Sequence, residues 1–479
     1  MTHKLLFTRL NKLTKEEFHR FEAFVRSPYF HKSEKAVQVM EHIRPFYPDF
    51  MISKTILNKI QKVVPSQAAY DVLLSRINDL LDEFEIYEAF NRKRFLADSL
   101  RYEVELEQKN NLKFYQQLQQ LPDTLIPSSD DFYADFYKEF ASIAVCENNW
   151  ITDKEKIIFH SEKAMTHLLY FFLSKYLLVY ANMITHSQNR IPVEETDVTQ
   201  RVFAFVSERI DQQPVSLQCI FYIIPLFKNI SGDKKEFDRY LEKIKQHTFH
   251  LRKDEISYEI KYSLVQASSA CVFKCYSDPS YFKDAFEIMQ FLVEQDLYFS
   301  GLHDMLVKQR FILVLKIALG ANQIEWAKQF ITDHITLIGK NIRVDFYNYA
   351  FGLIYFNQQQ YNEAVKLMVK INLHSAQFIA DYKMTLLKMY YELDDLAGFN
   401  YQSQTFLKFL GKDKSLNKTH KNNLIDSIQL IKWMFKYKKN KRQEEFQEKV
   451  SDKKLDYLVS NYRDKWFGEK YQTLILYPK

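Results

Sequence analysis

Hydrophobic residues along this chain recur every three or four positions, from Thr14 almost to the C-terminus, and that spacing is typical of helices with one buried face. The first helix begins after Thr14, which has the capping-box spacing with Glu17. It should end at Ser27, because Pro28 disfavours helical backbone in the residue before it. Its apolar stripe consists of Phe18, Phe21, Phe24 and Val25.

The same spacing predicts further helices in the N-terminal part. A helix from Ser33 should end near Pro45. Two prolines and a cluster of turn-forming residues make Pro122–Asp131 the best candidate domain boundary. Alternation typical of strands is absent, apart from the short run Thr473–Tyr477. The other helices predicted before the boundary are Lys54–Val63, Gln67–Phe90 and Lys93–Lys109.

Glycine usage supports an all-helical interpretation. Only 8 of the 479 residues are glycine, whereas β-hairpins and phosphate-binding loops need many positions with positive φ. Short turns between helices can use Asn, Asp, Ser and Pro instead. We therefore predict an all-α fold in three parts: an N-terminal helical region over residues 1–122, a solenoid of helix hairpins over 130–410, and a basic helical segment over 411–479.

A repeated pattern of small and aromatic residues lies in the predicted solenoid. Its best copy is Asn348–Ile371, and the copies are spaced by 42, 37 and 35 residues. The small anchor of the second helix lets that helix approach the first, and each hairpin exposes an apolar flank that the next one covers. The anchors are Ala285, Ala327, Ala364 and Phe399, preceded at nine residues by Tyr276, Ala318, Tyr355 and Tyr390, and at three residues by Phe282, Ile324, Tyr361 and Leu396.

This pattern resembles the tetratricopeptide repeat over about residues 260–410. Gly352 and Tyr355 match its first-helix positions, although Asn348 stands where that repeat has a tryptophan and the terminal proline is missing. The N-terminal part, with RSPYF at Arg26–Phe30 and LLSRINDLLDEF at Leu73–Phe84, resembles a family of uncharacterised bacterial helical proteins. That second resemblance implies no activity.

Catalytic motifs are absent from the sequence. It contains no GxGxxG, GxxxxGK[ST], GxSxG or HExxH motif, and its 13 histidines are scattered singly. Cys271 and Cys275 share a helix face, but no second pair of metal ligands lies near them in sequence, so we interpret them as small core residues. We therefore expect no enzymatic activity, no cofactor and no metal site.

The sequence also bears on location. Residues 1–9 lack the long apolar run of a signal peptide. The most apolar segment, Leu168–Ile184, is short for a membrane span and carries Lys175 near its centre, so a buried helix accounts for it better. We expect a cytoplasmic protein that does not cross a membrane.

Positive charge is concentrated at the C-terminal end, where residues 401–479 carry +9 and the rest of the chain carries −3. Basic and aromatic residues interleave there, which suits single-stranded nucleic acid or an anionic surface. The structural alternative is a helix whose aromatic side chains pack inward and whose lysines are solvated. The candidate nucleic-acid patch is Lys432, Lys436, Lys438, Lys439, Lys441 and Arg442, interleaved with Trp433, Phe435 and Tyr437.

A second candidate for nucleic-acid binding is a helix-turn-helix formed by Lys54–Val63 and Gln67–Phe90. Its second helix is rich in acidic side chains, which would repel phosphates. We therefore interpret this segment as two ordinary packed helices. The acidic residues are Asp71, Asp79, Asp82, Glu83, Glu85 and Glu88.

In a tetratricopeptide-like hairpin the first helix lines a concave groove. The positions that face it here are apolar, so a clamp for a peptide's terminal carboxylate is not expected. An amphipathic helix of a partner, or the tail through Leu474–Leu476, would cover such a surface; the alternative is that these side chains are core. We predict a non-enzymatic scaffold that binds a protein or peptide, or alternatively a nucleic-acid-associated regulator, and leave the oligomeric state open. The candidate groove residues are Phe346, Tyr349, Leu353 and Phe356.

Overall fold

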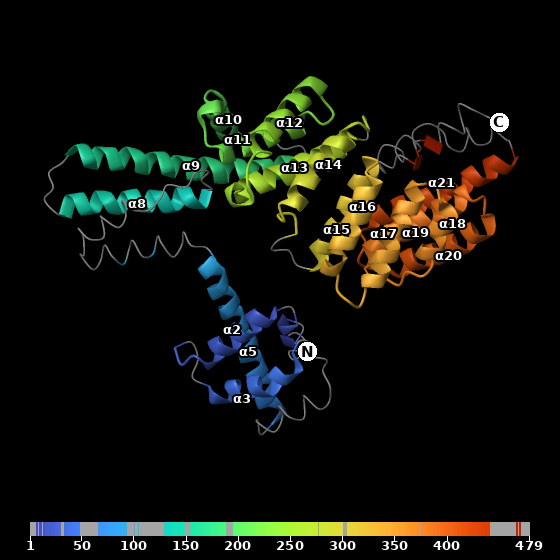
Figure 1. Ribbon diagram of the computed structural model, residues 1–479, viewed down its shortest axis with the longest axis horizontal. Helices are drawn as coiled ribbons and strands as arrows, with labels where there is room; N and C mark the ends of the chain where they lie inside the picture. The colour runs from blue at the N-terminus through green and yellow to red at the C-terminus, as the bar shows by residue number, and fades with distance from the viewer. Residues whose placement is uncertain are drawn as a thin grey trace. The chain divides into compact units, whose positions relative to one another are not determined.

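Every regular element in the part of the chain that the computed structural model describes is a helix (Figure 1), which confirms the predicted all-α fold for these residues. The chain divides into two compact units, Met1–Asp123 with Asp130–Leu169, and Thr124–Ser129 with Tyr170–Lys479. Residues 130–169 thus group with the N-terminal part, whereas the sequence assigned them to the solenoid. The described residues are 6–7, 9–11, 13–29, 33–47, 66–92, 100, 104, 129–148, 154–187, 195–275, 277–299, 304–373, 375–440, 466–467 and 469–470.

In the N-terminal part of the first unit, the helices whose bounds the structure describes are two short ones and a long one. The capping box at Thr14 is present: its hydroxyl accepts from the Glu17 N–H, and the Glu17 carboxylate accepts from the Thr14 N–H. The predicted helices 54–63 and 93–109 lie outside the described residues, apart from Leu100 and Val104. The bounds are α2 Lys15–Arg26, α3 Glu34–Ile43, the 3₁₀ turn η1 Arg44–Phe46, and α5 Gln67–Arg92.

Aromatic side chains form the core between α2 and α5. Phe21 and Phe24 both contact Phe84, with ring centroids 5.3 and 5.7 Å apart. On the acidic side of α5, Glu88 forms an ion pair with Arg20 of α2 at 2.9 Å. The apolar side of α5 is therefore packed, whereas most of its acidic side chains, including Asp71, Asp79 and Glu83, are exposed.

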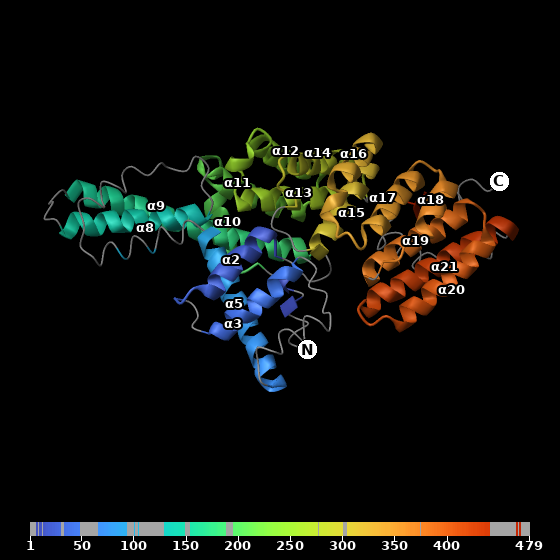
Figure 2. The same cartoon turned by 60° about the horizontal axis from the view of Figure 1, so that its bottom comes forward.

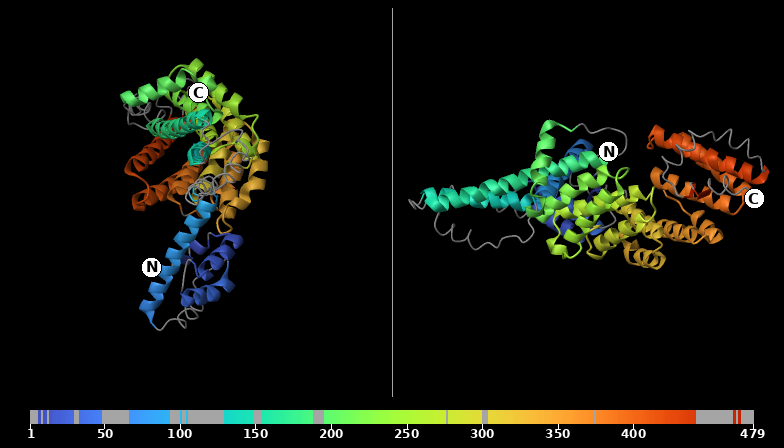
Figure 3. Two further views of the ribbon diagram at one scale, coloured as in Figure 1. Left: turned by 90° about the vertical axis from the view of Figure 1, so that its left-hand side faces the viewer. Right: turned by 90° about the horizontal axis from the view of Figure 1, so that it is seen from above.

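Two long helices, α8 (Ser129–Asn148) and α9 (Lys154–Ser187), run antiparallel side by side in Figures 1 and 3. In the portion that belongs to the first unit, His160 Nδ1 lies 2.5 Å from a Glu139 oxygen, and both side chains are less than a tenth exposed. Phe132 contacts His167 at a centroid distance of 6.4 Å. These contacts help to fix the alignment of the two helices.

The second unit is an array of helix hairpins. Its elements are α10 Asp197–Ser207, η2 Ile210–Gln212, α11 Val215–Lys228, α12 Lys234–Thr248, η3 Lys253–Glu255, α13 Tyr258–Lys274, α14 Tyr281–Glu294, α15 Asp304–Gly320, α16 Ile324–His334, η4 Ile335–Leu337, α17 Arg343–Asn357, α18 Tyr361–Met368, α19 Ala376–Glu392, α20 Leu396–Lys412 and α21 Lys418–Asn440. From α11 to α20 consecutive helices pair, and α21 packs on both helices of the last pair (Figure 2). This packing in neighbouring pairs is compatible with a helical solenoid.

One turn geometry recurs in three hairpins, α15–α16, α17–α18 and α19–α20. Each copy has one non-glycine residue with positive φ, and the next N–H donates to the carbonyl five residues earlier, as in a Schellman motif. The residues with positive φ are Asn322 (59°), Gln359 (61°) and Asp394 (56°). The donor–acceptor pairs are Gln323–Ala318, Gln360–Tyr355 and Asp395–Tyr390, at 2.8, 2.8 and 3.0 Å.

The anchors of the repeat frame lie in the core of the array. Ala285, Ala327, Ala364 and Phe399 have no exposed surface. In the best copy, a side chain at Gly352 of α17 would meet Met368 Cγ of α18 at 2.8 Å, so glycine is what allows the two helices to approach this closely.

We expect Gln359→Gly to stabilise the array by up to about 1 kcal/mol, because a Cβ in left-handed backbone costs about 1–2 kcal/mol and glycine loses part of that gain to chain entropy. The matched control is Gln358→Gly, where φ is −79° and glycine should destabilise by about 0.5–1 kcal/mol. Urea unfolding followed by circular dichroism measures both. Equal losses in the two variants would contradict this account of the turn.

Candidate functional site

The candidate groove residues lie in the interior of the array. Phe346 and Tyr349 have no exposed surface and Leu353 is 6 % exposed, while Phe356 is partly buried against the core. The prediction of an open apolar groove on α17 is therefore wrong. The alternative stated with it, that these side chains are core, describes the structure.

Neighbouring hairpins fill the groove side of α17. Lys316 of α15 and Asp381 of α19 form an ion pair at 2.6 Å, and the Tyr349 hydroxyl donates to the same carboxylate. Burial by itself raises the pKa of Asp381, but the Lys316 ammonium and the Tyr349 hydrogen bond outweigh it and hold that pKa below its usual value. The ion pair is partly exposed and joins the hairpins on either side of α17. The aromatic side chains of α17 are enclosed by apolar packing, such as the contact between Phe346 and Phe378 of α19 at a centroid distance of 5.1 Å.

The candidate nucleic-acid patch is divided between exposed lysines and structural contacts. Lys432 and Lys436 are exposed on α21. Lys438 is engaged within the fold: its Nζ lies 3.3 Å from Asp394 Oδ1 and 5.4 Å from the centre of the Tyr391 ring. Nucleic-acid binding stays a prediction. Outside the described residues lie the Lys439 side chain, Lys441 and Arg442.

The aromatic residues of that run that can be placed point inward. Phe435 is 4 % exposed and contacts Tyr391 of α19 and Phe399 of α20, with centroid distances of 5.1 and 5.0 Å. Trp433 is partly buried against the same cluster. Both side chains therefore pack inward, as the structural alternative stated. The Tyr437 side chain is not described.

The C-terminal end of the chain packs on the last hairpin. Trp466 and Phe467 are 9 % and 2 % exposed and belong to the cluster formed by α19, α20 and α21. Residues 466–467 and 469–470 have helical backbone. We call residues 466–467 and 469–470 the C-terminal turn. We call the residues that surround it the C-terminal docking site, which consists of Lys388, Tyr391 and Glu392 of α19 and Phe435 of α21.

One carboxylate receives two donors from the C-terminal turn. The indole N–H of Trp466 donates to Glu392 Oε1 at 2.6 Å, and Lys470 Nζ lies 2.8 Å from the same oxygen. The Glu392 side chain is only 12 % exposed. Because a carboxylate removed from water is costly without donors, these two contacts stabilise both the site and the turn.

Aromatic contacts complete the arrangement. Trp466 meets Tyr391 edge to face, with centroids 5.4 Å apart. Lys388, which is 7 % exposed, places its ammonium 5.5 Å from the Trp466 ring centre and 5.2 Å from that of Phe467. Both distances suit cation–π attraction. The site therefore offers the Lys388 cation to the rings of Trp466 and Phe467. It offers the Glu392 carboxylate to the Trp466 indole N–H and to Lys470.

The sequence analysis did not identify this site. It assigned a covering role to Leu474–Leu476, which lie outside the described residues. The signal that was available is the adjacent pair Trp466 and Phe467 in a polar, basic end, with Lys470 one helical turn after the tryptophan.

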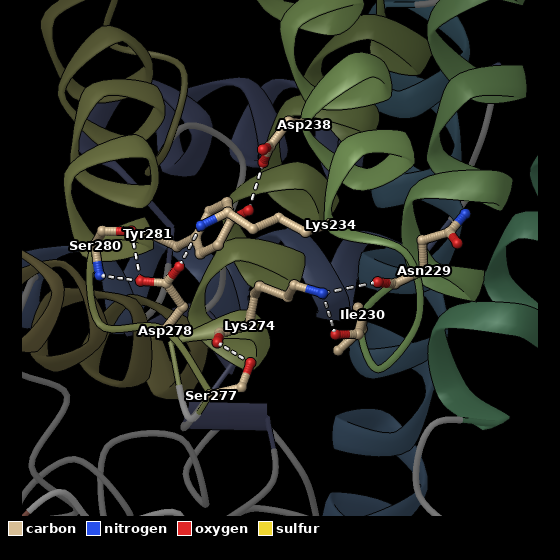
Figure 4. Close-up of polar contacts among 9 residues, drawn as sticks. All are labelled: Asn229, Ile230, Lys234, Asp238, Lys274, Ser277, Asp278, Ser280 and Tyr281. Atoms are coloured by element: carbon tan, nitrogen blue, oxygen red, sulfur yellow. Dashed lines mark hydrogen bonds and ion pairs between the residues drawn. The ribbon is translucent and has the colours of Figure 1, made fainter.

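A second polar cluster connects four helices of the array, α11, α12, α13 and α14 (Figure 4). Lys274 of α13 is 6 % exposed, and its ammonium donates to the carbonyls of Asn229 and Ile230 at 3.1 and 2.8 Å. These carbonyls follow the end of α11, so the lysine caps that helix. All the contacts made by the Lys274 ammonium that can be placed are therefore structural.

The other members of this cluster join α12 to α14. The Asp278 carboxylate accepts from Lys234 Nζ at 2.6 Å and from the Ser280 hydroxyl at 2.6 Å, which lowers the pKa of Asp278 to about 2 (Figure 4). The Tyr281 hydroxyl donates to Asp238, and burial together with that carboxylate raises the pKa of Tyr281. These contacts connect consecutive hairpins.

Cys271 and Cys275 are buried free thiols, as the sequence analysis expected of core residues. Burial raises the pKa of the Cys275 thiol to about 12, and that of Cys271 well above its ordinary value. Among the residues that the structure describes, no three His, Cys, Asp or Glu side chains gather as metal ligands would. The expectations that the chain binds no metal and is not an enzyme stay predictions.

Of the described helices, α9 alone is long and apolar enough to cross a membrane by length and composition. About 39 % of its most apolar stretch is buried inside the molecule. A core helix of a soluble protein passes the same test, so one such helix is weak evidence. The cytoplasmic location stays a prediction.

We expect Lys274→Met to destabilise the chain by about 1–3 kcal/mol, because two carbonyls at the end of α11 lose a buried donor. The control is Lys234→Met, which removes a more exposed ion pair and should cost below about 1 kcal/mol. Urea unfolding separates the two. A loss at Lys234 as large as that at Lys274 would contradict the assigned role.

No model of a known protein family matches the chain. No curated protein matches it either, and no solved structure does. A proposal about function therefore has to rest on the residues and contacts described above.

Proposed function

We propose that this chain is a non-enzymatic interaction scaffold that binds a protein or peptide partner. One observation supports the proposal: the last hairpin holds the aromatic side chains of a segment that lies beyond α21 in sequence. A buried indole, a charge-assisted hydrogen bond and a cation–π contact are the means by which protein surfaces hold a partner's anchoring residues.

We further propose that the hairpins are tetratricopeptide repeats, and that the N-terminal part belongs to the bacterial family it resembles. The first proposal is supported by the turn that recurs with the same hydrogen bond at Gln323, Gln360 and Asp395, spaced by 37 and 35 residues. Repeat arrays of this kind commonly act through their surfaces rather than through catalytic side chains.

The alternative function, a nucleic-acid-associated regulator, is supported by the exposed side chains of Lys432 and Lys436 on α21. It requires binding that weakens steeply with salt, because lysine contacts to phosphates release counterions. Lys438 contributes less to it, since that side chain already pairs with Asp394.

To test the proposed function, the docking site is emptied in the full-length chain by Trp466→Ala with Phe467→Ala. A fluorescein-labelled peptide of residues 463–472, RDKWFGEKYQ, is then titrated with this variant and followed by anisotropy. We expect saturable binding, at least tenfold weaker with wild-type protein because the tethered turn competes at high effective concentration. Tyr401→Ala, at an aromatic side chain 72 % exposed on α20, is the matched control and should behave as wild type.

Circular dichroism establishes that the emptied variant is folded, and Trp466→Ser alone is a second variant if the double change unfolds the end of the array. A folded variant that takes up no peptide would refute the proposal. Tight, salt-sensitive binding of a labelled single-stranded oligonucleotide, lost in Lys432→Glu with Lys436→Glu, would favour the alternative instead.

A further inference from the structure

The spacing of the donors in the C-terminal turn carries specific information. Trp466 and Lys470 both have helical backbone and are four residues apart in sequence, the spacing at which side chains share one face of a helix. Both reach the same atom, Glu392 Oε1, at 2.6 and 2.8 Å. Two donors that converge on one oxygen select for that spacing, because a shift of one residue turns a side chain by about 100° around a helix.

The site selects the aromatic pair, Trp466 and Phe467, independently of Lys470. The Lys388 ammonium lies over both rings, 5.5 Å from the centre of Trp466 and 5.2 Å from that of Phe467. An aliphatic side chain at either position would fill space but would offer no ring face to the cation. The indole N–H adds the bond to Glu392, which phenylalanine lacks at that position.

The helices α19, α20 and α21 pack against one another through contacts that do not involve the C-terminal turn. Phe435 links Tyr391 to Phe399, so α19, α20 and α21 contact one another without Trp466. Removing the turn would leave this packing in place while exposing Tyr391 and depriving Glu392 of its two donors.

We propose that the docking site recognises, in a protein partner, a single helical turn with tryptophan at one position, an aromatic residue next to it and a lysine four positions after the tryptophan. The chain's own C-terminal turn is the internal competitor for that ligand. This inference rests on the proposed function, since it names the class of partner for the same site.

Charge reversal tests the recognition rule. The emptied variant, Trp466→Ala with Phe467→Ala, is titrated with the parent peptide RDKWFGEKYQ and with the same peptide carrying Lys470→Glu. We expect the second peptide to bind at least tenfold more weakly. Adding Glu392→Lys to the protein should reverse the preference, so that the glutamate peptide binds better than the parent; this recovery shows that loss of binding is not loss of fold.

Spacing is tested with a third peptide of identical composition, in which Lys465 and Trp466 are exchanged so that tryptophan and lysine are five residues apart. We expect at least a tenfold loss with the emptied variant. If all three peptides bind within about twofold, the recognition rule is refuted while the proposed scaffold function survives. If the parent peptide does not bind at all, the proposed function fails with it.

Sedimentation velocity identifies the source of the ligand. We expect wild-type protein and the emptied variant to have the same oligomeric state, because the turn docks within its own chain. A wild-type dimer that dissociates in the emptied variant would mean that the turn binds a second copy, which would overturn its role as an internal competitor.

Discussion

The turn that joins paired helices sets the geometry of the array. It reverses the chain in a few residues by placing Asn322, Gln359 or Asp394 in left-handed backbone, and it closes with a hydrogen bond that spans five residues. That short reversal brings the two helices into contact, so the facing positions must be small or well matched, as Gly352 and Met368 are. Burial of the anchor Ala364 follows from this constraint.

Charged side chains inside the array are used mainly to join one hairpin to the next. Asp381 links the hairpins on either side of α17 through Lys316 and Tyr349, and Lys274 caps the end of α11. Lys274 is buried, and a buried charge is tolerated only with partners, so its contacts constrain the end of α11. The Lys316–Asp381 pair is partly exposed and joins the hairpins on either side of α17 at the surface.

In the part of the chain that the structure describes, no further hairpin follows α21. α21 covers part of the last pair, and Trp466 with Phe467 covers the part near Glu392. Terminal repeats need such a cap, because otherwise an apolar flank faces water. In the proposed function, a turn of the same chemistry from another protein takes the place of this cap. The capping requirement and the proposed partner site are thus aspects of one surface.

The sequence by itself determined the helical class, the first capping box and the end of α2, because these depend on residues within one or two turns of each other. It also suggested the repeat frame, since the small anchors Ala285, Ala327 and Ala364 recur at intervals of 42 and 37 residues. It could not separate a groove from a core at Phe346 and Tyr349. An aromatic stripe looks the same in both cases, and the difference is made by neighbouring hairpins, such as Phe378 of α19, which contacts Phe346.

The docking site depended on tertiary structure for the same reason. Glu392 and Trp466 are separated by 74 residues, and nothing local links a carboxylate at the end of one helix to an indole near the end of the chain. Each residue type taken alone has an ordinary interpretation, as a solvated acid or a scattered aromatic. Only folding, which brings both beside Lys388 and Tyr391, removes the carboxylate from water and makes its hydrogen-bond donors matter.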